Sequence, residues 1–344
     1  MRLSALFLPL LKIKVDGDKW LDLTKFLKSF QYLRQFFLDT LHMKCLIIGC
    51  GYVGLPLGAE LLRLGHEVFG LRRNGSAEAK LKAAGIHPLY GDITKPETLE
   101  ALPREFDWVV HCVAAGGDAA QYRQIYLEGT RNVIQWLSAN PPKKFIYTGS
   151  TSVYGQADGS QVKESSPAAP EAETAKVLVE TENVLLGTFH EKKFPAIILR
   201  VAGIYGPDRG HWFKQFLKNE ARMEGDGSRF LNMIHQDDVV GCILTALKSG
   251  RPGEIYNAVD DEPVNQRAFF EWLGATLGKY PPTTVPEDAT EARKRGVTNK
   301  RVSNRKMKME LGYQFRYPNF RKGYTAEILR LDRAGELRVL PDER

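Results

Sequence analysis

The feature that most constrains the fold is the segment CLIIGCGYVG, in which an apolar run leads directly into Gly49, Gly51 and Gly54. An apolar-periodic stretch from about residue 55 to 64 and the strand-like EVFGL follow, which predicts strand, tight turn, helix and strand. In this context the glycines serve the tight turn, the close approach of a pyrophosphate and the packing of the helix, and the helix N-terminus attracts phosphate. We predict a dinucleotide site here that includes Tyr52 and Val53.

The residues after the second predicted strand indicate which dinucleotide binds. A site for NAD has Asp or Glu about twenty residues beyond the glycines to accept from the ribose 2′-hydroxyl, whereas arginine accommodates the 2′-phosphate of NADP. The chain has Arg72 and Arg73 at this place. Two guanidinium groups in place of a carboxylate favour NADP over NAD, and the alternative is a pair of ordinary surface arginines.

Further strands follow at the intervals of an alternating α/β chain. The segments HPLYGDI, WVVHCVAA and KFIYTGSTSVYG predict the third, fourth and fifth strands. In open parallel sheets, ligands bind outside the carboxyl ends of the strands, so the turns after these segments are expected to face one crevice.

With these motifs in order, the chain resembles the extended and atypical short-chain dehydrogenases/reductases, the superfamily of NAD-dependent epimerases and dehydratases. The resemblance runs from Met43 to about Tyr324 and includes LRVAGIYGP, MIHQDDVV and EIYNAVDDEPV in the later half. It implies an α/β fold with a Rossmann-type doubly wound parallel sheet and a smaller, discontinuous α/β substrate-side region. It also implies adenine contacts at Asp92 and Ile93, further cofactor contacts at Val113, Ala114 and Ala115, and a catalytic hydroxyl at Ser150.

The chain departs from that family at its acid/base pair, YxxxK. Lys176 fits the lysine through its distance from Ser150 and through Glu180 four residues on, and Ala172 then stands at the tyrosine position. A second departure is Tyr126, where the family usually has asparagine. Alanine cannot transfer a proton, and a lysine of ordinary pKa stays charged near neutral pH. Lys176 is therefore a catalytic candidate only where it is desolvated, and otherwise it is expected to hold the cofactor ribose.

Glu173 is the first candidate for a surrogate base, because it precedes Lys176 by one helical turn. The commoner role of that spacing is a salt bridge along the helix. Tyr154 and His235 are further ionisable candidates, and both also fit as packing residues.

The chain is expected to comprise an extension (residues 1–42), a cofactor domain (43–200), a substrate-side region (201–330) and a tail (331–344). Within the extension, apolar residues at helical spacing between Leu23 and Leu41 predict an amphipathic helix, although Met43 is also a plausible older start. The apolar run SALFLPLL is too short to span a membrane.

Composition limits the partners and the compartment. Four cysteines without metal-ligand spacing favour a reducing, cytoplasmic setting and no metal. The net charge of +7 is concentrated after residue 290, where 15 Lys and Arg face 7 Asp and Glu. No nucleic-acid motif accompanies this basic segment, so nucleic acid is not an expected partner. The segment is interpreted either as a solvated face or as a site for a phosphate-bearing ligand. The oligomeric state is open, and a homodimer is one possibility.

Two functions follow from these observations. The first is an NADP-dependent oxidoreductase or epimerase/dehydratase-like enzyme that acts on a hydroxyl- or keto-bearing metabolite, with nucleotide sugars among the candidates. The second is a catalytically silent NADP-binding sensor or scaffold. Ser150 and Lys176 favour the first function, and Ala172 favours the second.

Overall fold

The central element is a seven-stranded, fully parallel sheet with the strand order β14-β9-β7-β6-β3-β4-β5. The computed structural model describes residues 12–16, 19–22, 42–286 and 298–337. The strands are β3 (Lys44–Ile48), β4 (Glu67–Arg72), β5 (His87–Tyr90), β6 (Trp108–His111), β7 (Lys144–Ser150), β9 (Ala196–Val201) and β14 (Ile255–Ala258). The predicted α/β class and the five predicted strands are confirmed.

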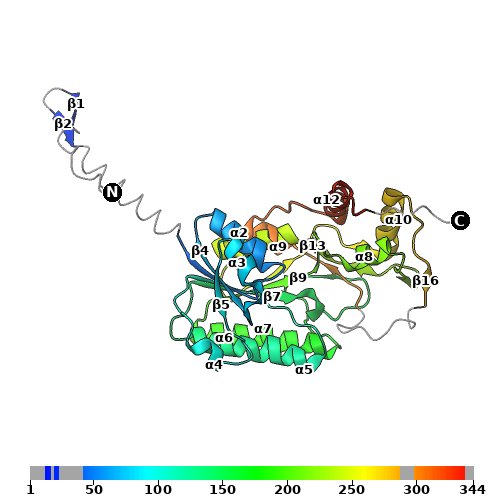
Figure 1. The fold of residues 1–344 in the computed structure, drawn as a ribbon, viewed down its shortest axis with the longest axis horizontal. Coiled ribbons are helices and arrows are strands. Elements are labelled where there is room, and N and C mark those ends of the chain that lie inside the picture. The colour runs from blue at the N-terminus through cyan, green and yellow to red at the C-terminus, as the bar shows by residue number, and fades with distance from the viewer. Residues whose placement is uncertain (1–11, 17–18, 23–41, 287–297, 338–344) are drawn as a thin grey trace.

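Helices cover both faces of this sheet (Figure 1). One face carries α2 (Gly54–Arg63), α3 (Glu78–Ala83) and α9 (Gln236–Ser249). The other carries α4 (Glu97–Glu100), α5 (Ala119–Tyr122), the π-helical segment η2 (Arg123–Glu128), α6 (Gly129–Leu137) and α7 (Glu173–Lys192). Because both faces are covered, the inner strands are mostly apolar, as in β9, whose buried sequence AIILRV has Arg200 as its one charged residue.

A second, smaller core lies beside the sheet and contains the rings of Tyr205, Phe269 and Tyr324. Its elements are β10 (Gly203–Tyr205), α8 (His211–Leu217), β11 (Met223–Glu224), β12 (Phe230–Leu231), β13 (Met233–His235), β15 (Val264–Asn265), α10 (Gln266–Leu277), β16 (Thr284–Val285) and α12 (Phe320–Arg333). The chain leaves this region to add α9 and β14 to the sheet and then returns, so the region is discontinuous in sequence, as predicted.

Short contacts join the C-terminal segment to the rest of the protein. The strand β17 (Arg301–Val302) pairs with β8 (Gln161–Val162), and α11 (Arg305–Leu311) packs near β14. The carboxylate of Asp238 accepts hydrogen bonds from the Tyr313 hydroxyl and from the backbone N–H groups of Arg316 and Tyr317, at 2.7, 2.7 and 2.9 Å. These contacts attach the basic C-terminal segment to β8, β14 and α9.

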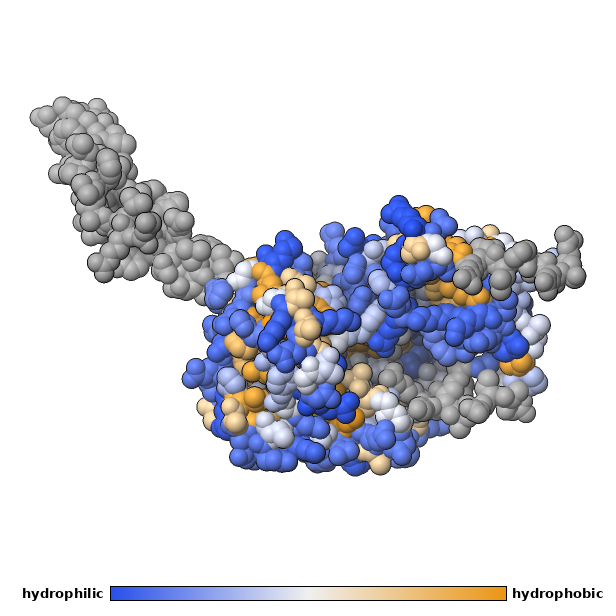
Figure 2. Space-filling model, in the orientation of Figure 1, coloured by the Kyte–Doolittle hydropathy of each residue, from blue (hydrophilic) through white to orange (hydrophobic). Residues whose placement is uncertain are grey.

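Of the N-terminal extension, the structure describes only the antiparallel pair β1 (Lys12–Asp16) and β2 (Lys19–Asp22). The predicted amphipathic helix between Leu23 and Leu41 lies outside the described residues. No helix within the described ranges is long and apolar enough to cross a membrane. Figure 2 shows hydrophilic residues over much of one face, interrupted by separate hydrophobic patches.

Candidate cofactor and substrate site

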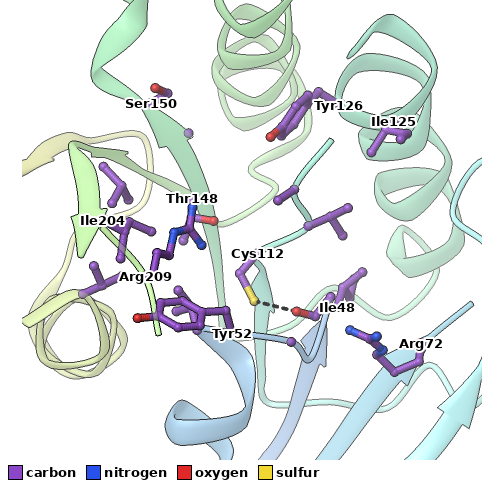
Figure 3. Close-up of a pocket in the computed structure, with 18 of the residues that line it drawn as sticks. Ile48, Tyr52, Arg72, Cys112, Ile125, Tyr126, Thr148, Ser150, Ile204 and Arg209 are labelled. Carbon is purple, nitrogen blue, oxygen red and sulfur yellow. Dashed lines mark hydrogen bonds between the residues drawn. The ribbon is translucent and has the colours of Figure 1, made fainter. Parts of the chain in front are cut away.

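A cavity of about 900 Å³ lies at the carboxyl ends of β3, β4, β6 and β7. Figure 3 shows Arg72 toward one end, Ser150 at the other, and Tyr52, Arg209 and Thr148 between them. This is the edge where the turns after the strands were predicted to face one crevice. Its volume lies within the range of small-molecule and cofactor sites.

The glycine turn after β3 forms the floor of this cavity, and its geometry excludes side chains. Gly49 has a φ of +84°, and a Cβ there would lie 2.8 Å from the Cα of Val113. A Cβ on Gly51 would lie 3.1 Å from Nη1 of Arg72, and one on Gly54 would lie 2.9 Å from Cγ2 of Ile47. Gly49 and Gly51 line the cavity, whereas Gly54 serves the packing of α2 on β3.

The N-terminus of α2 opens toward this turn. Among the described residues no side chain caps it, and its first turn has no acidic residue. The N–H of Leu55 already donates to the carbonyl oxygen of Gly51 at 2.9 Å, and Pro56 has no N–H. An anion at this end would therefore be held by the positive end of the helix dipole and by the N–H groups of Val53 and Gly54. The donor set and the glycine geometry fit the pyrophosphate of a dinucleotide.

Tyr52 and Val53 line the cavity at the same turn, and Tyr52 connects it to the substrate-side region. The Tyr52 hydroxyl donates to the carbonyl oxygen of Pro207 at 2.9 Å, and Nε2 of Gln236 donates to the carbonyl oxygen of Tyr52 at 2.6 Å. The guanidinium of Arg209 lies 5.0 Å from the centre of the Tyr52 ring. Burial raises the pKa of Tyr52 to about 12, so this phenol stays protonated at neutral pH.

The end of β4 carries the two arginines that the sequence singled out, and both line the cavity. Nη1 of Arg72 donates to the carbonyl oxygen of Cys50 at 3.4 Å, which holds the guanidinium over the glycine turn. Arg73 is exposed, and Asn74 and Ser76 of the following turn also line the cavity. This end of the cleft therefore combines two cations with an amide and a hydroxyl.

The predicted adenine contacts and the further predicted cofactor contacts are mostly in the cavity wall. Asp92, Ile93, Val113 and Ala114 line it, and Ala115 does not. Asp92 has a fixed orientation, because one carboxylate oxygen accepts from the backbone N–H and the hydroxyl of Thr94, at 3.0 and 2.8 Å.

Ser150 lies at the opposite end, where β7 runs into the turn of η3 (Thr151–Val153). Its Oγ accepts from the backbone N–H of Ser152 at 3.2 Å. Tyr126 and Leu178 line the same end of the cavity. The hydroxyl of Tyr126 accepts a hydrogen bond from the backbone N–H of Ala115 at 3.2 Å, which orients the phenol.

Helix α7 presents different residues on its two faces. Thr174, Leu178 and Glu182 are buried, and Leu178 lines the cavity. On the other face, Nζ of Lys176 lies 2.7 Å from Oε1 of Glu173, and their side chains are 49% and 71% exposed. Neither Lys176 nor Glu173 lines the cavity, and Ala172 is the residue that precedes the helix. The Lys176–Glu173 contact is the helix salt bridge that the sequence left open as an alternative.

The remaining ionisable candidates serve the packing of the protein. The Tyr154 hydroxyl is buried and donates to Oδ1 of Asn257 at 2.9 Å. Nδ1 of His235 accepts from the backbone N–H of Asp237 at 3.1 Å and so caps α9. Neither residue lines the cofactor cavity. Over the residues that the structure covers, no cluster of three potential metal ligands occurs.

Two groups of site residues were missed by the sequence reasoning. Arg209, His211 and Lys214 line the cavity from the loop after β10 and from α8, and their signal was the arginine between Gly206 and Gly210 just after YGP. Tyr126 was noted only as a departure from the family pattern. In the structure it lies in η2, and π-helical turns are frequent at functional sites.

The chain is similar to proteins of a known family. A model described as the NAD dependent epimerase/dehydratase family matches residues 45–258. Protein YeeZ of Escherichia coli strain K12 is 28% identical over 284 residues, which cover 80% of this chain and 97% of YeeZ.

Two solved structures extend this comparison. A functionally unknown conserved protein from Silicibacter pomeroyi DSS is 27% identical, with a TM-score of 0.69 over 84% of this chain and 98% of that one. The dTDP-glucose 4,6-dehydratase DesIV from Streptomyces venezuelae, solved with NAD and TYD, is 22% identical, with a TM-score of 0.73 over 85% and 97% of the two chains.

Proposed function

The chain belongs to the NAD-dependent epimerase/dehydratase family, and from this premise we propose that it is an NADP-dependent oxidoreductase or epimerase-like enzyme acting on a hydroxyl- or keto-bearing metabolite. The observation that carries the proposal is the cleft itself. It joins the glycine turn, two arginines at the end of β4 and the hydroxyl of Ser150 in one cavity. Such a cofactor, when bound, supplies or accepts a hydride at its nicotinamide ring.

The preference for NADP rests on Arg72 and Arg73. Guanidinium groups pair well with phosphate through charge-assisted hydrogen bonds. Arg72 is held over the glycine turn by its contact with Cys50, and Ser76 adds a hydroxyl at the same end. The pyrophosphate would lie at the N-terminus of α2, against Gly49 and Gly51.

The position of the family's YxxxK pair on α7 follows from the orientation of the helix. A catalytic pair must point into the cleft, and the residue of α7 that does so is Leu178. Thr174 precedes Leu178 by four residues and is also buried. We infer that the YxxxK positions of this chain are 174 and 178, occupied by threonine and leucine, so that both members of the pair are replaced.

The proton transfer then falls to other hydroxyl groups at the same end. Ser150 is the first choice to hold the substrate oxygen, because it lies where the cofactor cleft meets the substrate-side region. The phenol of Tyr126 is the second, since it lines the same end and can exchange a proton. We assign no role in catalysis to Lys176 and Glu173, whose exposed salt bridge lies on the outer face of α7.

One observation favours a catalytically silent NADP-binding protein instead. Leu178 has no charge with which to hold a ribose, as a lysine would. Thr174 cannot act as a proton donor in the way that a tyrosine phenol does. A silent protein would bind the cofactor and leave every carbonyl or hydroxyl substrate unchanged.

A hydride-transfer screen separates the two functions. The full chain, saturated with NADPH or NADP, is incubated with nucleotide sugars, 2-oxo acids and small ketones or alcohols. The absorbance of the reduced nicotinamide reports net oxidation or reduction, and chromatography of the products reports redox-neutral epimerisation or dehydration. With a substrate in hand, we expect Ser150→Ala and Tyr126→Phe to lower kcat at least tenfold, since general acid–base groups contribute about 10²–10⁴-fold. Lys176→Ala serves as the control with unchanged kcat. Cofactor binding without turnover on any class would support the silent alternative.

A further inference from the structure

A second cavity, of about 290 Å³, adjoins the cofactor cleft on the substrate side. The two cavities share Ser150, Ala202, Gly203, Ile204, Gly210 and His211 in their walls. A molecule in the second cavity therefore lies next to Ser150. The volume is at the lower end of the range for small-molecule sites.

Lys300 is the unusual residue of this second cavity. It comes from the basic C-terminal segment, yet it is only 4% exposed. Its Nζ donates to the carbonyl oxygen of Tyr154 and to Oγ1 of Thr298, both at 2.7 Å. An ammonium group has three N–H donors, so these two neutral acceptors leave one donor for a further partner.

The backbone around Lys300 is held in place, so the side chain is positioned in advance. Nδ2 of Asn232 donates to the carbonyl oxygen of Lys300 at 2.9 Å, and Oδ1 of Asn232 accepts from the backbone N–H of Val302 at 2.8 Å. Oδ1 of Asn299 accepts from the backbone N–H of Phe230 at 3.0 Å. A buried lysine on a fixed backbone is typical of a binding group rather than of a solvated surface charge.

The wall of this cavity is positively charged and contains no Asp or Glu among the described residues. Arg229 lines it as well, and its Nη1 lies 3.4 Å from Oε2 of Glu224, which is not part of the wall. Burial, followed by repulsion from Arg229, lowers the pKa of Lys300 to about 8. An anion beside Lys300 would offset both effects.

A hydroxyl donor completes the set. Ser152 lines the cavity, and its Oγ is buried with no hydrogen-bond partner in the described part of the chain. Buried polar atoms in folded proteins almost always have a partner. A bound oxygen would provide one.

We propose that the second cavity binds a compact oxyanion, a carboxylate or a phosphate group of the substrate, through Lys300 and Ser152. The inference rests on the proposed function and narrows it, because it assigns the enzyme a small anionic hydroxyl- or keto-bearing metabolite. The acid group lies in the second cavity, and the reacting oxygen lies toward Ser150.

The test is a calorimetric titration of the full chain with oxamate, which represents the carboxylate of a 2-oxo acid, and separately with inorganic phosphate. Both titrations are made with and without saturating NADPH. We expect one saturable site for at least one probe, and the preferred probe distinguishes a carboxylate from a phosphate. Lys300→Met should weaken its binding at least tenfold. The matched control is Lys308→Met in the same segment, because Lys308 is exposed, pairs with Asp261 and lines neither cavity.

The pH dependence gives a second readout. Binding should weaken as the pH rises through about 8, where Lys300 loses its proton. The other titratable or charged groups around it are Arg229, His211, Tyr205 and Tyr324 in the wall, and Glu224 next to Arg229. Acetylation of Lys300 in the unmodified protein, followed by mass spectrometry, should slow when the probe is present, which keeps the test decisive even where Lys300→Met does not fold.

Two results would overturn the inference: no saturable binding of either probe, or the same affinity and the same acetylation rate irrespective of Lys300 and of the probe. NADPH binding in the same samples separates the causes. If NADPH binds and neither probe does, only the oxyanion site is wrong. If neither NADPH nor a probe binds, the proposed function fails as well.

Discussion

The two ends of the cofactor cleft differ in the part of the chain that forms them. At the end near β3 and α2 the floor is the backbone of the glycine turn, where Gly49 has a positive φ and Gly51 leaves room for the side chain of Arg72. At the end near α7 they come from the side chains of Ser150, Tyr126 and Leu178. The first end depends on a local turn, and the second depends on which face of α7 points inward. A dinucleotide site at the first end can therefore persist when the side chains at the second end change.

A buried ion pair lies on the inward face of α7. Nη2 of Arg200 on β9 donates to Oε2 of Glu182 at 2.7 Å, and Nε donates to Oε1 at 3.0 Å. Their side chains are 4% and 3% exposed. On the outer face, Glu180 pairs with Arg123 at 2.8 Å, and both of these side chains are nearly half exposed. The two pairs are matched in chemistry and differ in burial.

The largest effect is expected from Glu182→Ala. The substitution leaves the Arg200 guanidinium buried without its carboxylate, which costs about 3–5 kcal/mol of the free energy of unfolding. Glu180→Ala on the same helix should cost no more than about 1 kcal/mol, because exposed ion pairs contribute little. Urea denaturation of both variants measures the difference. Equal losses would show that the two faces of α7 are not distinguished as described.

A smaller effect, dependent on pH, is expected at Lys300. Its pKa is about 8 in the folded protein and about 10.4 in an unfolded chain. Between these values the unfolded state binds more protons, so the stability of the unmodified protein rises with pH. Lys300→Met lacks this rise. Its stability relative to the unmodified protein should therefore fall by up to about 3 kcal/mol across that window, at 1.36 kcal/mol per pKa unit.

Urea denaturation of both proteins at pH 7 and at pH 9.5 measures this change. Because only the difference between the two proteins is compared, titrations that they share cancel. A difference in stability that stays constant with pH would contradict the lowered pKa of Lys300 and its burial without a carboxylate.

The smallest effect is expected from Lys176→Ala. Loss of its exposed salt bridge with Glu173 should change the free energy of unfolding by at most about 0.5 kcal/mol. The affinity for NADPH should stay the same, since Lys176 lies outside the cavity wall. A clear loss of NADPH affinity in a fluorescence titration would instead return Lys176 to the cofactor site.

Sequence reasoning reached the backbone-built end of the cleft and Ser150 at the other end, but not the inward face of α7. The signals for that backbone-built end are local in sequence: the glycine spacing, the strand before it and Arg72. The turn that they predict depends mainly on residues that are close together in the chain. Which face of α7 points inward is not determined by local sequence, because both Glu180 and Glu182 could be the glutamate that contacts the core. Two residues along a helix correspond to a rotation of about 200°, so that choice moves the inferred YxxxK positions to the opposite face. Arg200, the buried partner of Glu182, lies on a different element, β9.

Lys300 was beyond sequence reasoning for a similar reason. It lies in a basic segment whose members are mostly exposed, and its burial depends on contacts with Asn232 and Tyr154 that are distant in sequence. The positive charge of the segment can be read from the sequence. Which of its lysines and arginines is buried cannot.

The most direct test of the account is the affinity of the unmodified protein for NADPH compared with NADH, measured by fluorescence titration under one set of conditions. We predict that NADPH binds at least tenfold more tightly, because Arg72 and Arg73 meet the 2′-phosphate, and hydrogen bonds to charged groups contribute about 1.5–3 kcal/mol. Replacing both arginines with alanine should abolish this preference and leave the affinity for NADH within about twofold, since the phosphate contacts are absent from NADH. Equal affinities of the unmodified protein for the two cofactors would contradict the account.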